Sequence, residues 1–246
     1  MKVTSYKTKK VQIGDNLFSL LDEFLPTLKE RDIVIITSKI VSICQDRVIK
    51  NDGTVDKRAL IHQESDLYME EENLARYGII LTIKNNVLIA SAGIDESNGN
   101  GYFILWPQDI HRAAAEIWQH LREKHSIKNI GVIITDSHTT PLRWGTTGIG
   151  LAWCGFEPLK NYIETPDIFG RNLHVTKASI LDGLAAAAVT VMGEGNEQTP
   201  LALIRDIPFV QFQNRPPTDE EITSLRISLI DDIYSPLINS SKWKRP

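Results

Sequence analysis

The chain has 246 residues, of which 42% are hydrophobic and 24% charged, and its formal net charge is −4 at pH 7. This composition is typical of a globular protein with a sizeable core. The net negative charge disfavours nucleic-acid binding, which requires a basic surface. The two cysteines, Cys44 and Cys154, have neither metal-binding nor disulfide spacing, and no apolar run approaches the roughly 20 residues of a membrane span, so we expect a cytoplasmic protein without nucleic-acid or membrane partners.

The N-terminal part predicts a helix followed by a buried strand. Asp15 or Asn16 can cap a helix whose apolar residues between 17 and 24 share one face, and Pro26 lies where this pattern stops. The apolar, β-branched run 32–37 then predicts a strand.

The central part predicts a strand, a helix and a second strand. Acidic residues between 64 and 72 surround Leu67 and are typical of a solvated helix face without a binding role. Further on, an amphipathic helix is predicted over 110–121, between apolar runs at 87–90 and 131–135. This order favours a crossover unit with ligands at the ends of its strands.

The C-terminal part predicts two helices. Residues 178–192 are apolar on every side, so this helix is expected to be buried, and two glycines follow it. Thr218 and Glu221 form a capping-box pattern for a last helix that reaches Ile233, and Pro236 is expected to stop it.

Two apolar runs end in acidic, hydroxyl-bearing turns. One run leads to Asp95 and the other to Asp136 and Ser137. Strand ends hold carboxylates rigidly, and Mg²⁺ or Mn²⁺ binds one or two protein carboxylates together with water and substrate phosphate oxygens. A single such Asp is more often a strand end or a helix cap, but the pair favours a metal site.

Two segments could bind phosphate, although neither a Walker loop nor a dinucleotide-binding glycine motif is present. In the turn Thr37-Ser38-Lys39 a lysine follows a strand, and the glycines of segment 192–200 can expose backbone amides. A solvated lysine and a plain helix C-cap are the alternative interpretations.

Segment 136–148 is rich in polar side chains and lacks the periodicity of a regular element, which is typical of a ligand-binding loop. Arg143 suits a carboxylate or phosphate, and His138 could orient a substrate. Ser137, His138 and Asp136 could nominally form a hydrolase triad, but no GxSxG nucleophile elbow exists, which disfavours a serine hydrolase.

Five motifs together resemble the coenzyme F420:L-glutamate ligase family, whose members add glutamate to a deazaflavin precursor with GTP and metal ions. They are Ser38-Lys39-Ile40-Val41-Ser42, Ala92-Gly93-Ile94-Asp95-Glu96-Ser97-Asn98, Ile134-Thr135-Asp136-Ser137, Asp167 to Thr176, and Val191-Met192-Gly193-Glu194. The resemblance implies a mixed α/β fold (α+β) with two domains and an intertwined homodimer. We therefore expect one ligase-like unit over 1–239, with a subdomain boundary that composition does not place, and a frayed polar tail at 240–246.

The resemblance also implies roles for individual residues. Asp95 and Asp136 correspond to ligands of a first divalent ion, and Ser137 and Glu194 to ligands of a second. The implied guanine-nucleotide contacts are Ser38, Lys39, Asn98, Met192, Gly193, Gly195, Asn196 and Thr199. The expected substrates are L-glutamate and a small carboxylate-bearing acceptor, with GTP as co-substrate. Arg143 and His138 are our candidates for the catalytic residues that contact these substrates.

Three departures from the family pattern keep alternatives open. Ile43 replaces a nucleotide-contacting lysine, segment 8–11 differs from the family's N-terminal nucleotide segment, and segment 137–143 replaces its usual loop. The acceptor could therefore be the F420 precursor or a folate-type polyglutamate chain. The other readings are a nucleotide- or cofactor-binding protein without ligase activity and a metal-dependent phosphohydrolase.

Overall fold

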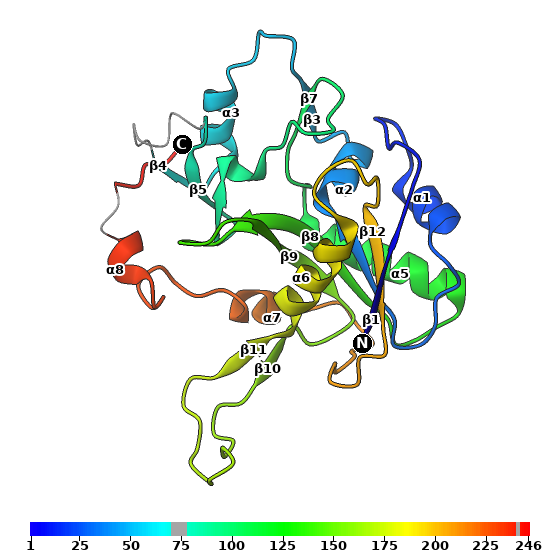
Figure 1. Ribbon diagram of the computed structural model, residues 1–246, viewed down its shortest axis with the longest axis vertical. Coiled ribbons are helices and arrows are strands. Elements are labelled where there is room, and N and C mark those ends of the chain that lie inside the picture. Colours follow the sequence, from blue (N-terminus) through cyan, green and yellow to red (C-terminus); the bar gives the residue numbers. More distant parts are fainter. Residues whose placement is uncertain (70–77, 240–241) are drawn as a thin grey trace.

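The structure is a computed structural model that describes residues 1–69, 78–239 and 242–246. Its centre is a five-stranded sheet in the order β1-β12-β2-β8-β9 (Figure 1). These strands are β1 Lys2–Tyr6, β2 Ile33–Thr37, β8 Gly131–Thr139, β9 Thr146–Cys154 and β12 Leu201–Arg205. Strands β2 and β8 are parallel, whereas the other neighbouring pairs are antiparallel.

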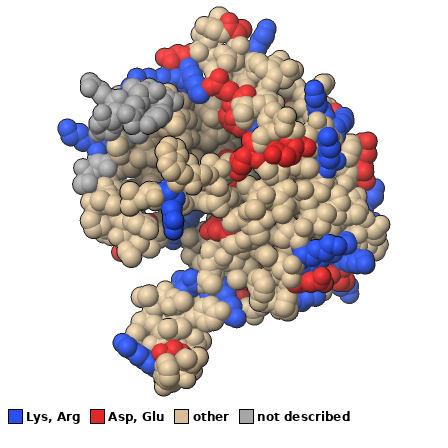
Figure 2. Space-filling view, viewed as in Figure 1, with Lys and Arg blue, Asp and Glu red and all other residues tan. Residues whose placement is uncertain are grey.

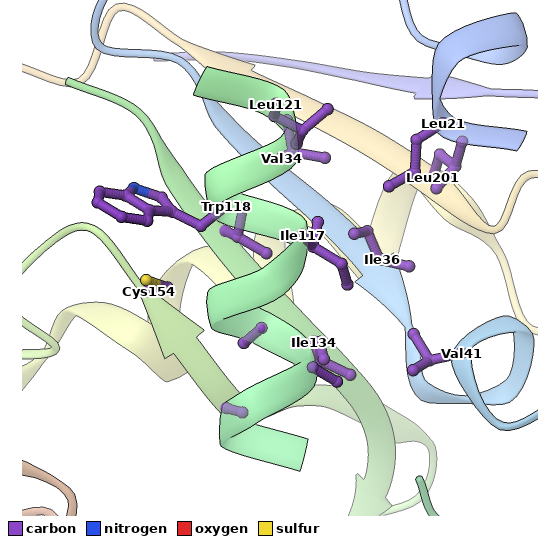
Figure 3. Close-up of a cluster of buried hydrophobic side chains, with 14 of the residues drawn as sticks. Leu21, Val34, Ile36, Val41, Ile117, Trp118, Leu121, Ile134, Cys154 and Leu201 are labelled. Carbon is purple, nitrogen blue, oxygen red and sulfur yellow. The ribbon is translucent and has the colours of Figure 1, made fainter. Parts of the chain in front are cut away.

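Helices pack on both faces of this sheet because alternate residues of its strands point to opposite sides. Val34 and Ile36 of β2 belong to a core with α1 Leu17–Phe24, α2 Ser38–Cys44 and α5 Ile110–His125 (Figure 3). Ile33 and Ile35 belong to a second core with α6 Ile180–Met192. The expected mixed α/β fold class is confirmed.

Several elements agree with the sequence patterns. The side chain of Asn16 caps α1 by accepting a hydrogen bond from Ser19 N at 2.9 Å. Strand β2, helix α5 and the capping box of Thr218 and Glu221 also form as predicted.

A long insertion between α2 and α5 carries smaller sheets with a hydrophobic cluster of its own. Its strands β4 Leu67–Met69, β5 Leu81–Lys84 and β6 Val87–Ala90 form one sheet, and β3 Val48–Lys50 pairs with β7 Tyr102–Ile104. It also contains α3 Lys57–Glu64 and the 3₁₀ turn η1 Ser91–Gly93. The predicted crossover unit is wrong, because β6 pairs with β5 whereas β8 lies in the central sheet next to β2.

The acidic segment also differs from its prediction. Helix α3 ends at Glu64, and Leu67 begins β4 instead of continuing a helix. Glu64 is not solvated as expected, because Arg47 and Lys84 bind its carboxylate. The remainder of this prediction, Glu70 to Leu74, lies outside the described residues.

The C-terminal helices are shorter and less buried than predicted. Helix α7 Asp219–Ser224 stops well before Ile233, and Pro236 lies in the first turn of α8 Ser235–Ile238 instead of ending a helix. Helix α6 buries only one face, and Thr190 and Val191 on its other face are exposed. In the described part of the C-terminal tail, Lys244 exchanges two backbone hydrogen bonds with Tyr68.

A hairpin arm projects from the body on strands β10 Leu159–Asn161 and β11 Lys177–Ser179 (Figure 1). Figure 2 shows this arm as a separate lobe, and the face above it is hollowed, with acidic side chains beside the hollow. Over the described ranges, we find no helix with the length and apolar character needed to cross a bilayer.

Candidate functional site

The first part of the site joins the start of α2 to the loop after η1. Helix α2 begins at Ser38, directly after β2, which places Lys39 in its first turn. The ammonium Nζ of Lys39 lies 2.6 Å from Oδ2 of Asp95. It also donates to the carbonyl oxygen of Ser97 at 2.9 Å and to its Oγ at 3.1 Å. Two segments that are 56 residues apart are thus joined by one ion pair.

Asp95 is fixed by its backbone as well as by its side chain. Its backbone exchanges hydrogen bonds with Ile104 at 3.0 and 2.8 Å. Its carboxylate accepts the Ser97 N–H at 2.7 Å and the Ser97 hydroxyl at 3.0 Å. Burial acts to raise the pKa of Asp95, but Lys39 and the two Ser97 donors outweigh it and hold that pKa below its ordinary value.

Asp136 is the second carboxylate, and it lies on β8 beyond the end of β2. Its Oδ2 accepts the indole N–H of Trp106 at 2.5 Å, and its Oδ1 accepts the Ser137 N–H at 2.8 Å. Burial raises the pKa of Asp136 to about 6, assisted by the negative charge of Asp95 and opposed by these two donors. The charge of Lys39 also acts on Asp136, so the three groups share one electrostatic environment.

The donor set of this environment fits a hard divalent cation. Asp95 and Asp136 supply carboxylate oxygens, and Lys39 already places one positive charge against Asp95. Hard cations with several bound waters need only one or two protein carboxylates. In the parts of the chain that the structure describes, no group of three or more His, Cys, Asp or Glu residues is arranged to hold a metal. A cation here would therefore take further ligands from hydroxyls, water or substrate.

The turn after α6 reaches the same region through Asn98. Asn98 Nδ2 donates to the carbonyl oxygen of Gly195 at 2.9 Å, and Gly195 N donates to the Glu197 carboxylate at 2.8 Å. The hydroxyl of Thr199 donates to the Met192 carbonyl and closes the turn. Gly193 has φ of +81°, a conformation that glycine adopts readily. The predicted nucleotide residues thus form two hydrogen-bonded pairs, Asn98 with Gly195 and Thr199 with Met192.

Glu194 and Asn196 are exposed in the same turn. Among the described residues, the Glu194 carboxylate has no hydrogen-bond or ion-pair partner, and no contact joins it to Asp95 or Asp136. The hydroxyl of Ser137 likewise makes no hydrogen bond within the described ranges, although its N–H binds Asp136. Among the described residues, no hydrogen bond joins Ser137 to Glu194, so their role at a second metal ion stays a prediction.

Segment 136–148 is a β-hairpin instead of the predicted irregular loop. Strand β8 continues to Thr139 and β9 begins at Thr146. His138 lies two residues beyond Asp136, on the same face of β8; burial lowers the pKa of its imidazole, opposed by the charge of Asp182. Arg143 is exposed at the hairpin tip, where its guanidinium makes no hydrogen bond or ion pair with a described residue. The structure thus places His138 near Asp136 but leaves Arg143 at a free tip.

No sequence motif pointed to Trp106. The residue ends an apolar run before Pro107 and could have been an ordinary core side chain. A tryptophan with a buried N–H needs an acceptor, and this need is the one signal that could have identified it.

Comparisons with known proteins agree on one family. The sequence model described as F420-0:gamma-glutamyl ligase matches residues 5–206. A coenzyme F420:L-glutamate ligase from Methanopyrus kandleri is 33% identical over 213 residues, which cover 81% of this chain and 84% of that protein. Those from Methanosarcina mazei and Methanococcus maripaludis are 30% and 34% identical, covering 85% and 82% of this chain and 88% and 87% of theirs.

Proposed function

The chain belongs to the F420-0:gamma-glutamyl ligase family, and we propose that it forms an amide between L-glutamate and a carboxylate-bearing acceptor, of which the F420 precursor is the first candidate. The observation that carries the proposal is the convergence of Asp95, Asp136 and Lys39 in one electrostatic environment. These residues come from three separate segments, and all three were implied by the family motifs.

The proposed reaction begins with activation of the acceptor, because a carboxylate is a poor acylating agent. An acceptor oxygen attacks the γ-phosphorus of GTP, which gives an acyl phosphate and GDP. The amine of glutamate then attacks the acyl carbon and forms the amide, and inorganic phosphate leaves with one acceptor oxygen. Mg²⁺ or Mn²⁺ bound at Asp95 and Asp136 would neutralise phosphate charge and align the oxygens for in-line transfer.

The residues around the carboxylates suit the phosphates of a nucleotide. Lys39 carries the positive charge that lies against Asp95, and its flexible side chain could exchange this partner for a phosphate oxygen. The backbone of segment 192–199, held by Asn98, is the proposed contact for the remainder of the nucleotide. Ser38 and Asn196 complete the proposed nucleotide set, and Ser137 and Glu194 remain proposed ligands of a second ion.

The β8–β9 hairpin is the proposed substrate-binding element. The lowered pKa of His138 keeps its imidazole neutral at pH 7, so it can accept a proton from the glutamate ammonium before attack. Arg143 carries a planar guanidinium with no partner among the described residues, and it is our candidate for a carboxylate of glutamate or of the acceptor.

One observation favours a second candidate, a nucleotide-binding protein without ligase activity. Ile43, which stands where the family resemblance implied a nucleotide-contacting lysine, is 8% exposed and packs as a core residue of α2. This position therefore offers no charge to the nucleotide.

Product analysis distinguishes these functions. The protein would be incubated with Mn²⁺, L-glutamate, GTP or ATP, and either the F420 precursor or a folate, and the products measured by mass spectrometry. The ligase proposal predicts a glutamate increment on one acceptor, and Asp95→Asn and Asp136→Asn should abolish it. Nucleotide binding without any increment would favour the binding protein, and nucleotide hydrolysis alone would favour a phosphohydrolase.

We also propose a cytoplasmic homodimer. The free thiols of Cys44 and Cys154 suit a reducing compartment. Ile168 and Phe169 are 92% and 88% exposed at the tip of the β10–β11 arm, and a second copy would cover them. Light scattering should give twice the chain mass of 27.7 kDa, and a monomer mass at micromolar concentration would contradict the dimer.

A further inference from the structure

Trp106 makes an unusual hydrogen bond for a buried tryptophan. Its side chain is 3% exposed, and its single polar atom, Nε1, donates to Oδ2 of Asp136 at 2.5 Å. The buried Trp118 instead donates to a backbone carbonyl, that of Ile130, at 2.9 Å. A backbone carbonyl would satisfy an indole N–H equally well, so the carboxylate partner of Trp106 calls for another explanation.

The backbone beside Trp106 is shaped to admit the indole ring. A Cβ atom on Gly93 would lie 2.1 Å from Nε1 of Trp106, and Gly93 has φ of +71°. Ser91 and Ala92 also have positive φ, at +51° and +53°. Non-glycine residues in this region store strain, and such strain concentrates at functional sites. Two consecutive non-glycine residues, Ser91 and Ala92, thus adopt an unfavourable conformation directly before the glycine that faces the ring.

A partly buried ionic group contacts Trp106 from elsewhere in the insertion. We call Arg47, Glu64 and Lys84 the support group. Arg47 Nε donates to the Trp106 carbonyl oxygen at 3.2 Å, and Arg47 Nη2 lies 2.8 Å from a Glu64 carboxylate oxygen. That same oxygen lies 2.7 Å from Nζ of Lys84, which sits 5.7 Å from the centroid of the Trp106 ring. The Glu64 and Lys84 side chains are 15% and 10% exposed, so each loses much of its hydration and depends on its ion pair.

The consequence is a carboxylate held in one orientation by neutral donors. Oδ2 of Asp136 accepts from Trp106 and Oδ1 accepts from Ser137. Each oxygen keeps a further lone pair, since a carboxylate offers about four acceptor positions. An indole N–H orients the group without placing a positive charge that would repel a cation, in contrast to Lys39 at Asp95.

We infer that Trp106 is a positioning residue, which orients the Asp136 carboxylate toward the divalent cation and is itself held by the support group. This inference rests on the proposed function, because it takes Asp136 to be a ligand of that cation. Partners that orient metal ligands from outside commonly change metal affinity 10- to 100-fold when they are removed.

The test compares Mn²⁺ affinity, measured by calorimetry, in the wild type, Trp106→Phe and Trp118→Phe. Both variants keep an aromatic ring and lose one buried indole N–H. We expect Mn²⁺ binding to weaken roughly 10- to 100-fold in Trp106→Phe and to stay within about twofold of the wild type in Trp118→Phe. In addition, Mn²⁺ should change the tryptophan fluorescence of the wild type and of Trp118→Phe, but not that of Trp106→Phe.

A milder variant covers the case in which Trp106→Phe fails to fold. Arg47→Lys keeps the charge beside Glu64 but loses the guanidinium contact with the Trp106 carbonyl, and should weaken Mn²⁺ binding roughly 3- to 10-fold. Unchanged Mn²⁺ affinity in the folded variants would overturn the inference while leaving the ligase intact. A wild type that binds no Mn²⁺ would overturn both the inference and the metal site, whereas Mn²⁺ binding without product formation would count against the ligase alone.

Discussion

Lys39 and Asp95 form an ion pair in which Nζ lies 2.6 Å from Oδ2, at the position where the family motifs imply a metal ligand. The ammonium thus occupies one side of a carboxylate that a divalent cation also needs. Binding of the cation must displace Lys39 or share Asp95 with it, and a released Lys39 is available to a nucleotide phosphate.

Lys39→Met should therefore have opposite effects on the two ligands. Mn²⁺ alone should bind more tightly, because no ammonium competes for Asp95, whereas GTP in the presence of Mn²⁺ should bind about tenfold more weakly. Calorimetric titrations measure both. Lys57→Met is the matched control, since Lys57 pairs with the neighbouring Glu96, and equal behaviour of the two variants would refute the role of Lys39.

Asp136 should reduce the stability of the metal-free protein above pH 6. Its native pKa of about 6 lies above the ordinary 3.8, so the native state binds a proton more tightly than the unfolded state does. This favourable contribution is complete below pH 3.8 and is lost as the pH rises through 6. Asp136→Asn should then raise the free energy of unfolding by up to about 3 kcal/mol at pH 8.

Urea denaturation in the presence of EDTA, repeated between pH 4 and pH 8, measures this difference. The gain from Asp136→Asn should shrink toward pH 4, where the wild-type carboxyl is protonated. A variant that is destabilised equally at both ends of this range would show that the charge of Asp136 does not set the pH dependence.

Gly93→Ala tests the close approach of Trp106. The new Cβ would meet the indole at 2.1 Å, so we expect a loss of about 2–4 kcal/mol in the free energy of unfolding and weaker Mn²⁺ binding. Gly101→Ala is the control, because Gly101 also has a positive φ, +86°, but no atom lies within 4 Å of its Cβ position. That variant should lose only about 1 kcal/mol, and similar losses in both variants would contradict the steric explanation.

Arg143→Lys tests the substrate role of the hairpin tip. Lysine keeps the charge but loses the planar pair of donors, so KM for glutamate or for the acceptor should rise roughly tenfold while GTP affinity stays unchanged. Steady-state kinetics and nucleotide titration separate these quantities. Arg112→Lys on the exposed side of α5 is the control, and wild-type kinetics for Arg143→Lys would remove Arg143 from the site.

Local signals in the sequence were sufficient for elements whose partners are close in the chain. The cap at Asn16 and the apolar stripe of α5 each depend on residues within a few turns. The pairing of strands depends on residues far apart in the chain, and an apolar run does not encode which other run lies beside it. For this reason the predicted crossover unit placed β6 and β8 together wrongly. The last predicted helix failed for a related reason. Leu225 still packs against the second core, but Ile233 at the end of the predicted apolar stripe is exposed, so no core supports the helix that far.

The residues of the candidate site likewise fall into those that a local sequence pattern identifies and those that it does not. Asp95 and Asp136 could be selected because each follows an apolar run that ends in polar residues. Trp106 and its support group could not, since their contacts join positions 47, 64, 84, 106 and 136 and no single segment contains a pattern for them.

The fate of the acceptor carboxylate oxygen tests the proposed ligase most directly. An acceptor labelled with ¹⁸O in its carboxylate would be incubated with GTP, Mn²⁺ and glutamate, and the released phosphate analysed by mass spectrometry. Activation through an acyl phosphate predicts one ¹⁸O atom in each phosphate that is released with product. The Asp136→Asn variant should release no phosphate. Phosphate without ¹⁸O, which has gained its fourth oxygen from water, would contradict the ligase and identify the chain as a nucleotide hydrolase.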